Sequence, residues 1–142
     1  MVKAKNLPFF KQVLHDLFLE YKAKLRLNKD WTIVTCVEQE KHTYGEVVYD
    51  YNNRKFIVKI NNEINKTVRS LKDSIIHEFW HILLCPLTNR FENTLDKIEQ
   101  GKKIDVKRLR KTIENEEERL VRKFTRIIMD IERQNAKNNK KK

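Results

Sequence analysis

Cysteine is scarce in this sequence, and long apolar runs are absent from it. The two cysteines, Cys36 and Cys85, form no CxxC pair and lie in apolar surroundings, so a disulfide-rich secreted scaffold is not expected. The longest apolar run falls far short of the roughly 20 residues that span a bilayer. The opening segment mixes acids and bases with apolar side chains, which is unlike a secretory signal peptide. We therefore expect a cytoplasmic protein with no membrane partner.

Positive charge is in excess, with 31 basic and 20 acidic residues among 142 and a net charge of +11. The last nine residues, Gln134 to Lys142, carry four lysines and no acid, which predicts a disordered basic tail over residues 134–142. The length of residues 1–133 suits one domain, and an apolar fraction of 39% is enough to form a core. A lysine-rich surface predicts no more than weak, non-specific binding to nucleic acid.

The first sixty residues change from a helical to an alternating apolar pattern. Residues 8–27 are predicted to form an amphipathic helix, since apolar side chains recur at helical spacing after Pro8. Residues 31–37, 44–51 and 56–60 are rich in β-branched or alternating apolar side chains, which predicts three strands. The turn dipeptide at residues 52–53 favours a hairpin between the last two strands. We expect a small three-stranded antiparallel sheet in a meander.

Two further helices are predicted after the sheet, so the expected fold class is α+β. The first begins near Val68, is apolar on most of its circumference and is expected to end at Pro86. The second opens near Asp105, a good N-cap residue, and runs to about Arg133. Its apolar stripe, expected to face the core, consists of Leu109, Ile113, Leu120, Phe124, Ile127 and Ile131, with Val121 and Ile128 beside it.

The buried helix contains the motif His77-Glu78-Phe79-Trp80-His81, which is HExxH. Residues four apart on a helix face the same way, so the two imidazoles can bind one Zn²⁺ ion. Glu78 is expected to act as general base toward a zinc-bound water, whose pKa the metal lowers toward about 7. Two histidines that bracket a glutamate inside an apolar helix are harder to explain as core residues than a single histidine. The motif therefore predicts a zinc hydrolase centre.

A catalytic zinc needs a third protein ligand and an open position. No histidine follows His81, so HExxHxxGxxH is excluded and a carboxylate is expected. Glu117 follows Ile113 by four residues and falls inside the apolar stripe of the last helix, where an unpaired carboxylate would be costly. Glu117 is therefore the predicted third ligand. Glu118 is the alternative, because a small error in register exchanges the two.

Taken together, HEFWH and the downstream segment EEERLVRKF give the chain a resemblance to the minimal gluzincin-type zinc metallopeptidases. It is similar to small HExxH proteins encoded by phages and to the peptidase domains of phage-repressor-cleaving proteins. In that group the second helix often reads E-x-x-(small)-Asn-x-x-Ala, and the matching stretch here starts at Glu117 or one residue later. The resemblance implies a zincin-like fold, and an edge strand that binds an extended peptide above the metal.

The expected function is hydrolysis of a protein or peptide by a zinc metallopeptidase. An alternative is a basic nucleic-acid-associated or regulatory protein with a structural or vestigial zinc site. A structural site is closed by four protein ligands and needs no general base, so Glu78 favours catalysis. A protease recruited to nucleic acid by its charge, as in the SprT-like crosslink-repair proteases, is a further alternative. The zinc-ribbon cysteines of that group are absent here.

Overall fold

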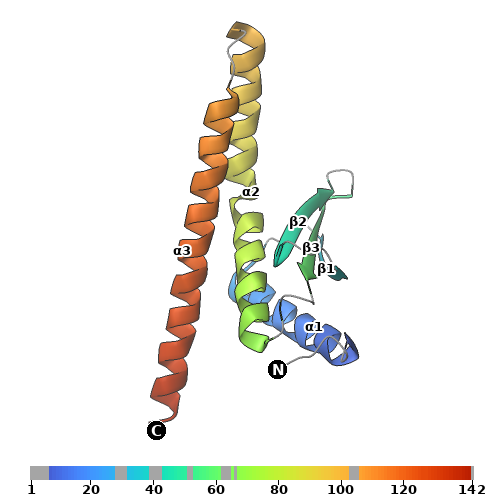
Figure 1. The fold of residues 1–142 in the computed structure, drawn as a ribbon, viewed down its shortest axis with the longest axis vertical. Helices are drawn as coiled ribbons and strands as arrows, with labels where there is room; N and C mark the ends of the chain where they lie inside the picture. Colours follow the sequence, from blue (N-terminus) through green and yellow to red (C-terminus); the bar gives the residue numbers. More distant parts are fainter. Residues whose placement is uncertain are drawn as a thin grey trace. The chain divides into compact units, whose positions relative to one another are not determined.

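The computed structural model describes residues 7–27, 32–38, 43–50, 53–61, 65, 67–102 and 106–141. Its elements, in chain order, are α1 (Leu7–Lys24), β1 (Thr32–Glu38), β2 (Gly45–Asp50), β3 (Lys55–Asn61), α2 (Val68–Lys102) and α3 (Lys107–Asn139) (Figure 1). The chain divides into two compact units, Met1–Ile82 and Leu83–Lys142. The first contains α1, the three strands and the start of α2. The second contains the rest of α2 and α3.

The structure confirms the first predicted helix as amphipathic, because the apolar side chains that recur at helical spacing are buried. These are Phe10, Leu14, Leu17 and Tyr21, to which Phe18 is added. The helix closes with a left-handed residue, Arg26, at φ 48°. Hydrogen bonds from the backbone N–H of Leu27 to Lys22 O and of Arg26 to Ala23 O complete a Schellman motif, which satisfies carbonyl groups at the helix end.

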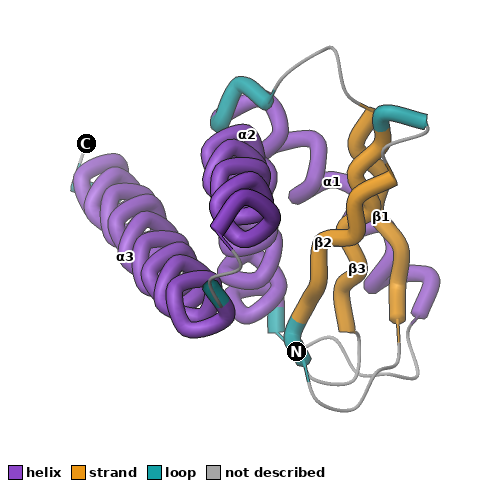
Figure 2. Tube along the Cα trace, turned by 90° about the horizontal axis from the view of Figure 1, so that it is seen from above, coloured by secondary structure: helices purple, strands orange, loops and turns teal. Residues whose placement is uncertain are grey.

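The sheet is mixed, which corrects the expectation of an antiparallel meander. Its strand order is β1-β3-β2, with β1 parallel to β3 and β2 antiparallel to β3 (Figure 2). The predicted hairpin between β2 and β3 is confirmed. Phe56, Val58 and Ile60 of β3 are buried, so the most apolar strand occupies the centre, where both of its edges are paired. The prediction was wrong for β1 because it assumed that consecutive strands are neighbours.

A buried asparagine ties the sheet to the first turns of α2. Asn65 Nδ2 donates hydrogen bonds to Tyr44 O and Asn61 O, both at 2.8 Å. Its Oδ1 accepts hydrogen bonds from Ser70 Oγ at 2.9 Å and Ser74 Oγ at 2.7 Å. Because the side chain is fully buried, these bonds offset the cost of removing it from water. Asn65 thus fixes the entry to β2, the exit of β3 and the start of α2 in one position.

The helix α2 does not end at Pro86, contrary to the sequence prediction. It continues to Lys102 with the proline inside it. Proline removes one backbone donor and crowds the preceding turn, which weakens a helix without ending it when later residues are held by other contacts. Such contacts are present, because Leu95 is buried and Thr88 Oγ1 donates a hydrogen bond to Glu117 Oε2 of α3 at 3.0 Å.

In the second unit, ion pairs join the later part of α2 to α3 in an antiparallel arrangement (Figure 1). Arg110 donates from Nε to Glu92 at 2.9 Å and from Nη1 to Glu99 at 2.8 Å, and it also pairs with Asp96. The hydrogen bonds to Glu99 and Glu92 raise the pKa of Arg110, so the guanidinium stays charged. One arginine therefore binds three carboxylates spread over two turns of α2.

Helix α3 differs from the prediction at its end and in the face that is buried. It remains helical to Asn139, through most of the segment predicted to be a disordered tail. Its fully or nearly fully buried residues are Val121 and Thr125, whereas Leu109, Ile127 and Ile131 of the predicted core stripe are exposed. The predicted N-cap Asp105 lies outside the described residues. Within the part of the chain that is described, none of the helices is both long and apolar enough to cross a bilayer.

Candidate metal centre

The HExxH motif lies on the first half of α2, in the unit Met1–Ile82. This helix begins at Val68, after Thr67, whose Oγ1 accepts a hydrogen bond from the Ser70 N–H at 3.0 Å. Its buried side is formed by Leu71, Ile75, Ile76, Phe79 and Ile82, as the sequence predicts. The ring of Phe79 packs edge-on against Phe18 of α1 at a centroid distance of 5.4 Å. The apolar contacts therefore fix the rotation of α2 and the direction of its histidines.

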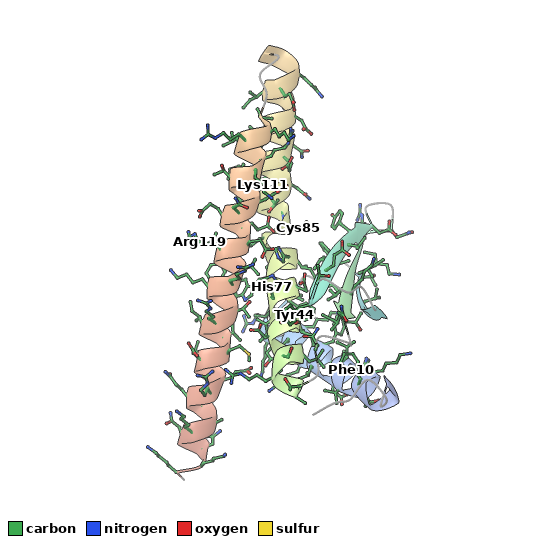
Figure 3. All side chains as sticks on the ribbon, viewed as in Figure 1. Phe10, Tyr44, His77, Cys85, Lys111 and Arg119 are labelled. Carbon is green, nitrogen blue, oxygen red and sulfur yellow. The ribbon has the colours of Figure 1, made fainter. Side chains whose placement is uncertain are left out.

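The two histidines of the motif point the same way from α2. His77 Nε2 and His81 Nε2 lie 3.3 Å apart, and both residues are half-buried. The ring centroids are 5.1 Å apart with an interplanar angle of 63°. Figure 3 marks His77 on this part of α2. The structure thus confirms that the spacing of four residues brings two imidazole nitrogens together.

The distance between the two nitrogens fits a shared zinc ion. Tetrahedral zinc binds imidazole nitrogen at about 2.0–2.1 Å, which places two such ligands about 3.3–3.4 Å apart. His77 Nε2 and His81 Nε2 meet this requirement without any change of rotamer. The same separation also permits a long N–H···N hydrogen bond when one ring is protonated at Nε2. The pair is therefore a suitable half of a metal site.

Glu78 is buried, with 6% of its surface exposed, and lies beside the first residue of β2. A Cβ atom placed on Gly45 would lie 3.1 Å from Glu78 Oε1, 3.2 Å from Glu78 Cγ and 3.1 Å from the Lys59 carbonyl oxygen. All three distances are tighter than ordinary van der Waals contact. Gly45 therefore lets the edge strand approach the glutamate closely. The sequence analysis did not find this role, although a glycine at a strand start close to polar residues was a usable signal.

Replacement of Gly45 by alanine is expected to displace Glu78 and to lower the hydrolytic rate by about tenfold or more, because misplacing a catalytic group by about 1 Å can cost about a hundredfold. Zinc content should change little, because the atoms nearest to the added Cβ belong to Glu78 and Lys59 and the two histidines are carried by α2. The measurement is the rate and the zinc content of Gly45→Ala beside those of Gly101→Ala. Gly101 is the matched control, because nothing lies within 4 Å of a Cβ at that position. Equal rates for the two variants would contradict the role given to Gly45.

The two candidate carboxylates, Glu117 and Glu118, lie on α3 in the unit Leu83–Lys142. Glu117 Oε2 accepts a hydrogen bond from Thr88 Oγ1 at 3.0 Å, between half-buried residues of the same unit. Glu118 Oε2 lies 3.8 Å from Arg122 Nε, one turn further along the helix. Thr88 is a partner that the sequence analysis missed, because a contact between two helices leaves no local pattern.

Cys85 lies near Glu117 in the same unit and stays a neutral thiol at neutral pH. Burial raises its pKa, the negative charge of Glu117 raises it further, and a hydrogen bond from Asn89 Nδ2 at 3.6 Å lowers it in part. A thiol needs to lose its proton to become a nucleophile or a good metal ligand. Cys85 is therefore a poor candidate for either role, although it follows His81 by one helical turn.

His15 lies on the exposed side of α1, as its position in the periodic pattern predicts, and His42 lies outside the described residues.

Comparison with models of protein families, with curated proteins and with solved structures gives no match. The chemistry of this centre therefore has to be inferred from its own residues.

Proposed function

We propose that the chain is a zinc-dependent metallopeptidase, with His77 and His81 as metal ligands and Glu78 as general base. The observation that carries the proposal is the separation of 3.3 Å between His77 Nε2 and His81 Nε2. It is supported by the burial of Glu78, which is the next residue after the first ligand. A structural zinc site has no use for a buried carboxylate that is free of the ligand role. The arrangement therefore favours catalysis over a structural ion.

Zinc, when bound, supplies a positive charge that polarises the scissile carbonyl group and acidifies a water molecule. The role of Glu78 is to take a proton from that water and later to give it to the leaving amine. Burial helps in this role, because a carboxylate with little access to bulk water holds its position and interacts more strongly with a nearby proton donor. Gly45 contributes by letting Glu78 and the edge strand lie in close contact.

A third ligand from α3 is part of the proposal, and we favour Glu118. The sequence ranked Glu117 first because it falls in the apolar stripe, but Leu109, Ile127 and Ile131 of that stripe are exposed. The buried side of α3 is marked by Val121 and Thr125, and it lies between the two glutamates around the helix: Thr125 is about 20° from Glu118, and Val121 is about 40° from Glu117. The carboxylate of Glu117, by contrast, is already bonded to Thr88.

The substrate that fits this centre is an extended peptide. β2 is an edge strand of the sheet and begins beside Glu78, so a peptide paired with β2 would pass close to the general base. Strand addition supplies hydrogen bonds between backbones, and these bonds do not depend on the side chains of the bound peptide. This mode of binding is also what the resemblance to gluzincin-type peptidases implies.

The proposed ligand set is tested by comparing two conservative variants. Wild-type protein, purified without chelators, should contain about one zinc ion per chain. Glu118→Gln should lose most of this zinc, because an amide is a much weaker zinc ligand than a carboxylate. Glu117→Gln should keep it and serves as the matched control, since it lies on the same turn of the same helix. The reverse result would assign the ligand to Glu117, and retention of zinc by both variants would remove α3 from the site.

A further inference from the structure

Helix α3 carries most of its basic side chains on one face. At about 100° per residue, eight of the ten lysines and arginines of this helix fall in a sector of about 120°, with Lys111 at one edge and Lys123 at the other. An even spread would place about three of the ten in such a sector. All eight are exposed, and they are here called the basic row: Arg108, Lys111, Arg119, Arg122, Lys123, Arg126, Arg133 and Lys137.

The basic row is long, because α3 is one continuous helix (Figure 1). At a rise of about 1.5 Å per residue, it extends about 44 Å from Arg108 to Lys137. Lys137 belongs to it only because the helix continues through residues that the sequence predicted to be a disordered tail. The sector contains one acid and no aromatic or branched apolar side chain, since its other residues are Thr112, Asn115, Met129 and Asp130.

The charges of the basic row are held only weakly within the chain. Four of its members pair with an acid three or four residues away on α3, at distances between 2.8 and 3.8 Å: Lys111 with Glu114, Arg119 with Glu116, Arg122 with Glu118 and Arg133 with Asp130. In each pair both side chains are at least 44% exposed, and such pairs are weak and screened by salt. The other four form no ion pair with any residue that the structure describes: Arg108, Lys123, Arg126 and Lys137.

We propose that the basic row binds the phosphate backbone of double-stranded DNA. Its length of about 44 Å matches about 13 base pairs, and each phosphate that a lysine or arginine neutralises releases a counterion condensed on the DNA. The major groove of B-DNA is about 12 Å wide and admits a helix, whereas that of an RNA duplex is too deep and narrow. Contacts to phosphates carry no sequence information, so we expect binding that does not depend on base sequence.

Two other polyanions fit the basic row less well. Proteins that bind single-stranded nucleic acid stack its bases on aromatic side chains, and the one aromatic residue of α3, Phe124, is half-buried and lies outside the sector. A helix that binds an anionic membrane borders its apolar face with basic residues. On α3 the exposed Ile127 and Ile131 have the basic row on one side only, while Glu114 and Glu117 lie on the other side.

The proposal uses no residue of the HExxH motif and is independent of the zinc chemistry. It is tested by fluorescence anisotropy of a labelled DNA duplex of about 24 base pairs, titrated with the full chain at several salt concentrations between about 50 and 200 mM. With five to eight phosphate contacts, the logarithm of the wild-type association constant should fall against the logarithm of the salt concentration with a slope of about −4.5 to −7.

The row variant replaces by glutamine the four members that form no ion pair, Arg108, Lys123, Arg126 and Lys137. Its slope should be shallower by about 3 to 4, and its affinity at about 100 mM salt should be at least about thirtyfold lower. Glutamine keeps the helix propensity, so circular dichroism should show the same helix content. The single variant Arg126→Gln should make the slope shallower by about 1, which tests the same row if the fourfold variant folds poorly.

The matched control removes the same number of charges from exposed positions of α1 and α2, by glutamine at Lys11, Arg69, Arg90 and Lys97. Its affinity should fall by less than about threefold, because these residues lie outside the basic row. An equal loss in the control and the row variant overturns the proposal, since binding would then follow net charge. Equal or tighter binding of single-stranded DNA or of an RNA duplex of the same length overturns it too. So does a wild type that binds vesicles containing phosphatidylserine but not the DNA duplex.

Discussion

Replacement of Glu78 by glutamine is expected to lower the rate of peptide hydrolysis by about 10²–10⁴-fold while zinc remains bound. Glutamine has nearly the same shape as glutamate, so the space beside Gly45 stays filled. Its amide cannot accept the proton from water, which removes the general base. The two histidines keep their positions on α2, so their affinity for zinc should change little.

The measurement is the cleavage of a mixture of unstructured peptides by zinc-loaded protein, followed by mass spectrometry, with zinc content determined on the same samples. Glu46→Gln is a suitable control, because Glu46 belongs to the same strand as Gly45 and its side chain is half exposed. A Glu78→Gln variant that cleaves peptides as fast as the wild type would show that Glu78 is not the base. Loss of zinc together with activity would instead make Glu78 a ligand.

The sequence predicted correctly the helices whose apolar side chains share one face and are buried on that face. In α1 and the first half of α2, side chains such as Leu14, Tyr21, Ile75 and Phe79 recur at helical spacing and are buried. For the same reason the HExxH motif was placed correctly. Once a helix is known to be buried on one side, a spacing of four residues determines that His77 and His81 point together.

The buried face of α3 could not be predicted, because periodicity shows which residues share a face and not which face is covered. The apolar stripe of this helix includes the exposed Ile127 and Ile131, whereas the polar Thr125 is buried. Thr125 tolerates burial because its hydroxyl donates a hydrogen bond to Val121 O at 2.8 Å within the helix. This local bond explains why a polar residue can occupy the buried side of α3.

Contacts between distant segments account for the other differences. The continuation of α2 past Pro86 depends on Leu95 and on the carboxylates bound by Arg110, which are visible only once α3 is in place. The parallel pairing of β1 with β3 depends on a crossover that no local pattern marks. The close approach of Gly45 to Glu78 joins residues 33 positions apart and decides how the candidate base is held. Each of these is a tertiary effect that overrides local propensity.

Replacement of His81 by alanine is expected to reduce the zinc content from about one ion per chain to a small fraction of that value. Loss of one of two adjacent imidazoles leaves a site with too few donors to hold zinc against solvent. The same change should remove the stabilisation that zinc gives to the folded chain. A ligand present at a hundred times its dissociation constant stabilises by about 2.7 kcal/mol, so the wild type should melt at a clearly higher temperature with zinc than with a chelator.

Melting curves with and without zinc, measured beside the zinc content, separate the metal site from a simple hydrogen bond between the two rings. A zinc-free pair joined by N–H···N would give the wild type no zinc-dependent shift, and His81→Ala would differ from it only by a lost hydrogen bond of about 1 kcal/mol. His15→Ala is the control, because His15 is exposed on α1 and should leave both readings unchanged. Two outcomes would contradict a zinc ion shared by Nε2 of His77 and His81, which lie 3.3 Å apart. One is a wild type that binds no zinc, and the other is a His81→Ala variant that keeps a full zinc ion per chain.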